Sequence, residues 1–86
     1  MASNRKAFDR ALKRAANQAS NGSWAKAIRA YTRALKEFPE DTTALVGLGE
    51  AYLEADQLEP AREISQELQL IARGDPGALS YLATLE

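Results

Sequence analysis

The chain has 86 residues, a length that allows one domain and buries too little surface for a large enclosed active site. It contains no cysteine and no histidine, which excludes disulfides, thiolate nucleophiles, the usual general base and the commonest metal ligands. The net charge of −1 conceals a division, because residues 1–36 carry nine Lys or Arg and one Asp, whereas residues 37–86 carry two Arg and eleven Asp or Glu. We therefore expect no enzyme, no cofactor and no metal.

No stretch of the chain approaches the ~20 apolar residues of a membrane-spanning helix. The N-terminus also lacks the apolar core of a secretory signal. The sequence predicts a cytoplasmic protein that does not bind a membrane.

Apolar and small residues recur at helical spacing along the chain, and no segment alternates with the period of a strand. The breaks between these stretches predict five helices, with boundaries good to about two to four residues, at 4–20, 24–37, 42–55, 59–72 and 76–85. The connections are short, which makes consecutive helices antiparallel neighbours.

The breaks carry residues that end one helix and begin the next. Gly22 and Gly74 suit the left-handed position that follows a helix. Pro60 and Pro76 fall in a first helical turn, where a missing N–H is harmless. Side chains that can cap the first amides of the following helix are Ser23, Asp41 and Asp75.

The chain also repeats itself. Positions separated by one constant offset match as follows: Trp24 with Leu58, Ala27 with Ala61, Leu45 with Leu79, and Leu48 with Leu82. The motif Leu45-x2-Leu48-Gly49-x2-Tyr52 and the closing Pro39 resemble the tetratricopeptide repeat, whose helix pairs recur every ~34 residues, the offset found in this chain. The resemblance implies an all-α fold in which antiparallel helix pairs stack as a short right-handed solenoid.

On this interpretation residues 1–86 form a single domain. Repeat 1 covers about 8–41, repeat 2 covers 42–75, and 76–86 supplies the first helix of a third repeat or a capping helix. In that family the small residue of a first helix faces the second helix of its own pair. Close approach of the two helices then offsets the cost of Gly49 within a helix, about 1 kcal/mol relative to alanine.

The first helix admits two registers. Strict spacing places Ala15 at the glycine position and Arg14 at a leucine position. A shift of one residue places an apolar set inward, namely Leu12, Ala15, Ala16 and Ala19. We favour the shift, which predicts a turn one residue shorter.

The resemblance implies a non-catalytic scaffold that holds a peptide segment of a partner protein on a concave face lined by the first helices. The expected groove residues are Arg10, Lys13, Asn17, Val46, Gly47, Glu50 and Tyr81. The basic members and Asn17 favour acidic groups, and Val46 and Tyr81 supply apolar contact.

A second hypothesis is self-association. The final helix has no partner in this sequence, and it is apolar on more than one side. The expected contact residues are Leu79, Leu82 and Leu85. On this hypothesis the chain forms a homo-oligomer, in which the opposed charges of its two halves join the copies.

A basic stripe follows the second predicted helix and consists of Lys26, Arg29, Arg33 and Lys36. One period later the counterparts of Arg29 and Arg33 are Glu63 and Glu67, which predicts lateral ion pairs between the two helices. The alternative is a docking face for nucleic acid or an acidic partner. Net negative charge and the lack of interleaved aromatic residues argue against nucleic acid, so we expect no nucleic-acid ligand.

Overall fold

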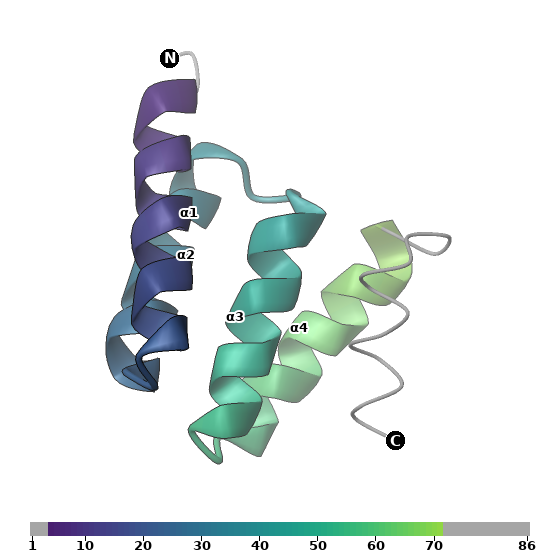
Figure 1. Cartoon of the computed structure of the whole chain (residues 1–86). Coiled ribbons are helices and arrows are strands. Elements are labelled where there is room, and N and C mark those ends of the chain that lie inside the picture. Colours follow the sequence, from purple (N-terminus) through teal and green to yellow (C-terminus); the bar gives the residue numbers. More distant parts are fainter. Residues whose placement is uncertain (1–3, 72–86) are drawn as a thin grey trace.

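A computed structural model describes residues 4–71, which fold into four α-helices without a strand in that range (Figure 1). The helices are α1 (Arg5–Ser20), α2 (Trp24–Glu37), α3 (Thr42–Glu54) and α4 (Leu58–Ile71). Their bounds confirm four of the predicted helices to within one residue. The fifth predicted helix, 76–85, lies outside the described residues, as do Gly74, Asp75 and Pro76.

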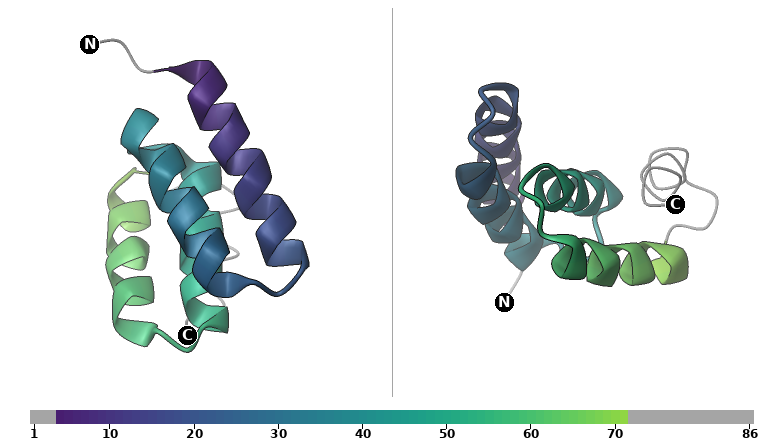
Figure 2. Two further views of the ribbon diagram at one scale, coloured as in Figure 1. Left: turned by 90° about the vertical axis from the view of Figure 1, so that its left-hand side faces the viewer. Right: turned by 90° about the horizontal axis from the view of Figure 1, so that it is seen from below.

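The helices form two antiparallel pairs, α1/α2 and α3/α4 (Figures 1 and 2). The pairs are joined chiefly by contact between α2 and α3, and the first helices α1 and α3 also touch. No Cα atoms of α2 and α4 come within 8 Å of each other. The described part of the chain is therefore a stack of two helical hairpins, as the repeat predicted.

The two hairpins keep the repeat period of the sequence. α3 ends one period after α1, and α4 begins one period after α2. Gly22 and Asp56 lie at matching positions in the two turns, and both have positive φ, 76° and 62°. The turns are equal in length, so the one-residue shift predicted for the first helix is wrong.

Burial along α1 leads to the same correction. Ala15 is fully buried, as is expected of the counterpart of the buried Gly49. Ala16, which the shifted register directed inward, is exposed like its strict counterpart Glu50. The register of α1 is therefore the strict one.

The helix starts show which of the expected caps form. Asp41 accepts a hydrogen bond from the N–H of Ala44 at 2.9 Å, which confirms the predicted cap of α3. Ser23 stands at the N-cap of α2, but its side chain makes no capping hydrogen bond, so this prediction is wrong. Pro60 lies in the first turn of α4, as predicted.

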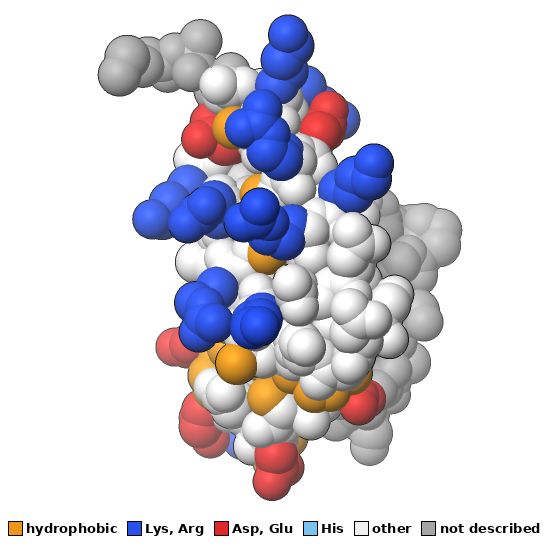
Figure 3. Space-filling view, turned by 60° about the vertical axis from the view of Figure 1, so that its left-hand side comes forward, with side chains coloured by type: hydrophobic (Ala, Val, Ile, Leu, Met, Phe, Trp, Pro, Cys, Tyr) orange, Lys and Arg blue, Asp and Glu red, His pale blue; other side chains and the backbone are white. Residues whose placement is uncertain are grey.

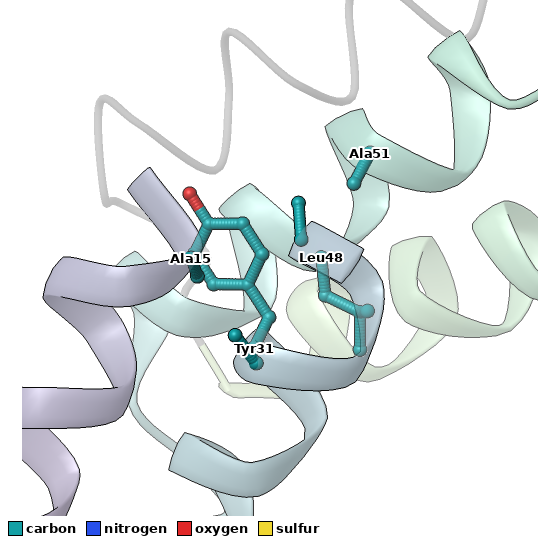
Figure 4. Close-up of a cluster of buried hydrophobic side chains, with 6 residues drawn as sticks. Ala15, Tyr31, Leu48 and Ala51 are labelled. Carbon is teal, nitrogen blue, oxygen red and sulfur yellow. The ribbon is translucent and has the colours of Figure 1, made fainter. Parts of the chain in front are cut away.

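The central core forms where α1, α2 and α3 meet. Tyr31 of α2 lies between Ala15 of α1 and Leu48 of α3 (Figure 4). Ala27 and Ala61, which match each other in the repeat, are both fully buried. The buried part of this core thus consists of the Tyr31 ring, Leu48 and four alanines.

Two smaller contacts hold the rest of the fold. Leu45 and Leu68 are almost fully buried against each other and join α3 to α4. Phe8 and Phe38 meet edge to face, with ring centroids 5.0 Å apart. Burying a side chain of this size stabilises the fold by roughly 1.5–3 kcal/mol. The contact between the two rings therefore ties α1 to the end of α2.

Trp24 and Leu58, a matched pair in the sequence, differ in the structure. Trp24 is half-buried and packs against the central core. Leu58 is 52% exposed and is not part of a core.

No helix within residues 4–71 has the length and apolar character needed to cross a bilayer.

Candidate functional site

The described part of the predicted groove comes equally from α1 and α3, and α3 contributes Val46, Gly47 and Glu50. Val46 and Gly47 are half-buried, and Glu50 is exposed. Gly47 and Glu50 are three residues apart, so they lie on the same side of the helix. This side of α3 is one part of the surface that the first helices form.

Gly47 lies against the ring of Tyr31. A Cβ atom added at position 47 would lie 2.8 Å from the Tyr31 hydroxyl oxygen and closer still to two carbons of the ring. Glycine at this position therefore lets the ring reach the backbone of α3. The sequence predicted close helix approach at Gly49 and assigned Gly47 only to the groove, so this role of Gly47 was missed.

Tyr31 connects the core to the groove. It is 9% exposed, and burial raises the pKa of its phenol above the usual 10.0, with the negative charge of Glu50 as a second cause. The phenol is thus neutral at physiological pH and retains its O–H next to Glu50. Tyr31 was not among the predicted groove residues, because the sequence does not reveal that its hydroxyl lies near Gly47.

On α1, Lys13 and Asn17 are exposed. Within residues 4–71 neither side chain forms an ion pair or hydrogen bond. In the strict register Lys13 is the counterpart of Gly47, whereas Asn17 is the counterpart of the buried Ala51. The register therefore places Lys13 beside the groove and Asn17 toward the free edge of the first pair.

The remaining predicted site residues lie outside the described range. They are Tyr81 of the expected groove and Leu79, Leu82 and Leu85 of the expected self-association face.

A furrow with a volume of about 720 Å³ runs between α1 and α2. Its lining residues are Ala7, Arg10, Ala11, Arg14, Gln18, Lys26, Arg29, Ala30 and Arg33. Figure 3 shows Lys and Arg side chains gathered on this face of the molecule. Arg10, which the sequence placed in the groove, lines this furrow together with Arg14.

The lateral ion pairs predicted from α2 to α4 are not formed. The ion pairs found within residues 4–71 lie inside single helices, Arg5–Asp9 at 3.3 Å and Glu59–Arg62 at 4.0 Å. Both are exposed and contribute at most about 1 kcal/mol each. The basic stripe on α2 is therefore not neutralised by α4.

Stacked helical hairpins with one repeated spacing define a helical-repeat protein. The family model of the tetratricopeptide repeat matches residues 18–85, and the chain belongs to this family. No curated protein and no solved structure matches the chain. Tetratricopeptide repeats generally mediate protein–protein interactions and act as non-catalytic scaffolds.

Proposed function

We propose that the chain is a non-catalytic interaction module that binds a peptide segment of a partner protein on the concave face of α1 and α3. The supporting observation is the surface around Gly47. Here one helix lacks a side chain, the Tyr31 hydroxyl lies directly against its backbone, and Glu50 follows on the same side.

The chemistry of these groups suits an extended peptide. The Tyr31 ring fills the space that a side chain at position 47 would occupy, and its hydroxyl is a hydrogen-bond donor and acceptor at this surface. Glu50 can accept hydrogen bonds from peptide N–H groups. Lys13, at the position of α1 that matches Gly47, can donate hydrogen bonds to carbonyl or carboxylate oxygens. Val46 adds a half-buried apolar contact. The proposed ligand is therefore a mixed polar and apolar segment rather than a uniformly charged one.

The strict register limits the set of groove residues. Lys13, Val46, Gly47 and Glu50 belong to the proposed site, with Tyr31 beneath them. Arg10 lines the furrow instead, and Asn17 lies at the edge. Tyr81 stays a prediction, as does self-association through the final helix.

The test begins with peptides selected from a random display library on the intact chain. A fluorescent copy of a selected peptide is then titrated against the wild type and the variant Glu50→Lys. We expect roughly tenfold weaker binding or more, because a hydrogen bond to a charged group is lost and its charge is reversed.

Glu63→Lys is the matched control, since it makes the same charge change on the exposed side of α4. The control should bind the peptide as the wild type does. Equal losses in the two variants would show that net charge, and not the α1/α3 face, governs binding.

A further inference from the structure

We propose that the furrow between α1 and α2 is a second docking site, which receives an acidic helix of a partner protein. We call it the basic furrow and define it by its five cationic residues, Arg10, Arg14, Lys26, Arg29 and Arg33. It lies on a different set of residues from the proposed peptide groove, so the two proposals stand independently.

The charge of the basic furrow is the first argument. Both walls are cationic, since α1 supplies Arg10 and Arg14 and α2 supplies the other three residues. No carboxylate lines the furrow in the described part of the chain, and all five cations are exposed. Four of the five are arginines, whose planar guanidinium groups bind carboxylates through paired hydrogen bonds.

The second hairpin shows what such a furrow can hold. The counterparts of Arg10 and Arg14 are Ala44 and Leu48, and both are buried. Ala44 packs with Ala34 of α2, and Leu48 packs with Tyr31 of α2. The α3 side of the matching surface is therefore covered by α2, whereas Glu63 and Glu67 on its α4 side stay exposed. A helix thus fits against the wall that α1 supplies to the first furrow.

The residues of the basic furrow decide the character of that helix. An apolar helix such as the inner side of α2 would bury Arg10 and Arg14 without partners, which is costly. A helix with carboxylates on one side would pair with both walls. The floor consists of small residues, Ala7, Ala11 and Ala30, which leave room for a backbone to approach.

The same features favour protein over nucleic acid. No aromatic side chain lines the basic furrow, so it offers no platform on which bases can stack. The chain as a whole has a net charge of −1, which does not favour a polyanion.

The probe for the test is a fluorescein-labelled alanine-rich peptide of about 20 residues, long enough to form a helix, with glutamates spaced every fourth position. Its control carries glutamine at the same positions. Binding is measured by fluorescence anisotropy at several salt concentrations. We expect the glutamate peptide to bind and its affinity to fall as salt rises, and the glutamine peptide not to bind.

Two charge-matched double variants locate the site. Arg29→Gln with Arg33→Gln removes two charges from the basic furrow, and we expect an affinity loss of about tenfold or more. Lys6→Gln with Lys36→Gln removes two charges from exposed positions outside it, and we expect less than about a twofold change. Helical circular dichroism establishes that both variants fold.

Three results would overturn the proposal. Equal losses in the two double variants would show that binding follows net charge alone. Tighter binding of a single-stranded oligonucleotide, lost in the furrow variant, would identify nucleic acid as the occupant. The third result is a gain in solution mass at low salt that is lost in the double variant Glu63→Gln with Glu67→Gln. That result would identify α4 of a second copy as the occupant of the basic furrow.

Discussion

Gly22 and Asp56 occupy the same place in the two helical hairpins, one repeat period apart, and both adopt the left-handed backbone conformation. Glycine adopts it without strain, whereas an L-residue with a Cβ does not. Nothing lies within 4 Å of a Cβ added at Gly22. Backbone conformation and not crowding therefore sets the preference for glycine at position 22, and Asp56 has the same left-handed conformation.

We predict the same order of stability at both turns, with glycine above aspartate and aspartate above alanine. Gly22→Ala should lower the free energy of unfolding by about 1–2 kcal/mol. Asp56→Gly should raise it by about 0.5–1 kcal/mol, because the strain of a left-handed L-residue is relieved. Urea unfolding of these variants and Asp56→Ala measures the order, and a neutral Gly22→Ala would contradict it.

Gly47→Ala should destabilise the fold although alanine is the better helix former. The helix propensity gain is about 1 kcal/mol, and overpacking against a buried ring costs typically about 1–3 kcal/mol. We expect a net loss in urea unfolding, because Tyr31 is enclosed by the central core. The explanation fails if the same substitution is equally costly in a Tyr31→Leu background, where no ring meets the new methyl group.

The two N-caps provide an internal comparison. Asp41→Ala removes the hydrogen bond to the Ala44 N–H and should cost about 1 kcal/mol in unfolding free energy. Ser23→Ala should cost clearly less, because the Ser23 side chain makes no capping bond. Thermal or urea unfolding measures both, and a larger loss at Ser23 would contradict the structure.

The raised pKa of Tyr31 predicts a loss of stability at high pH. Burial and, second, Glu50 make the folded state hold the phenol proton more tightly than the unfolded state, whose pKa is near 10.0. The contribution is constant below that pH, and it is lost as pH rises above it because the unfolded state ionises first. Unfolding free energies of the wild type should therefore fall more steeply between about pH 9 and 11 than those of Tyr31→Phe. Parallel curves would contradict this account.

The helices could be predicted from the sequence because their ends carry local chemistry. A left-handed glycine at 22 and a capping carboxylate at Asp41 fix the breaks without reference to the rest of the fold. The wrong prediction of a cap at Ser23 also has a local cause. A serine permits a capping bond, but the capping residue is typically extended, as Asp41 is, and the backbone of Ser23 is not.

The register of α1 could not be read from apolar residues alone. Ala15 and Ala16 are equally apolar, and a pattern that counts apolar residues accepts both as inward. Arg14 appeared to exclude the strict register because it stands at a leucine position. In the structure that position lies on a side of α1 that no described helix covers, so an exposed arginine is acceptable there.

The basic furrow was missed for the same reason. The stripe on α2 is visible in the sequence, but the second cationic wall comes from Arg10 and Arg14 of α1. The strict repeat period, applied to α1, would have placed both arginines opposite the stripe. The role of Gly47 left no comparable signal, because only the structure brings Tyr31 to its backbone.

The most direct test of the proposed peptide groove is a chemical-shift map of the ¹⁵N-labelled chain, titrated with a peptide selected from the display library. The account predicts that the amide signals of Lys13, Val46, Gly47 and Glu50 move together and saturate with the peptide, while those of Glu63 and Glu67 on α4 stay in place. Shifts confined to α4, with Gly47 and Glu50 unmoved at saturation, would contradict it.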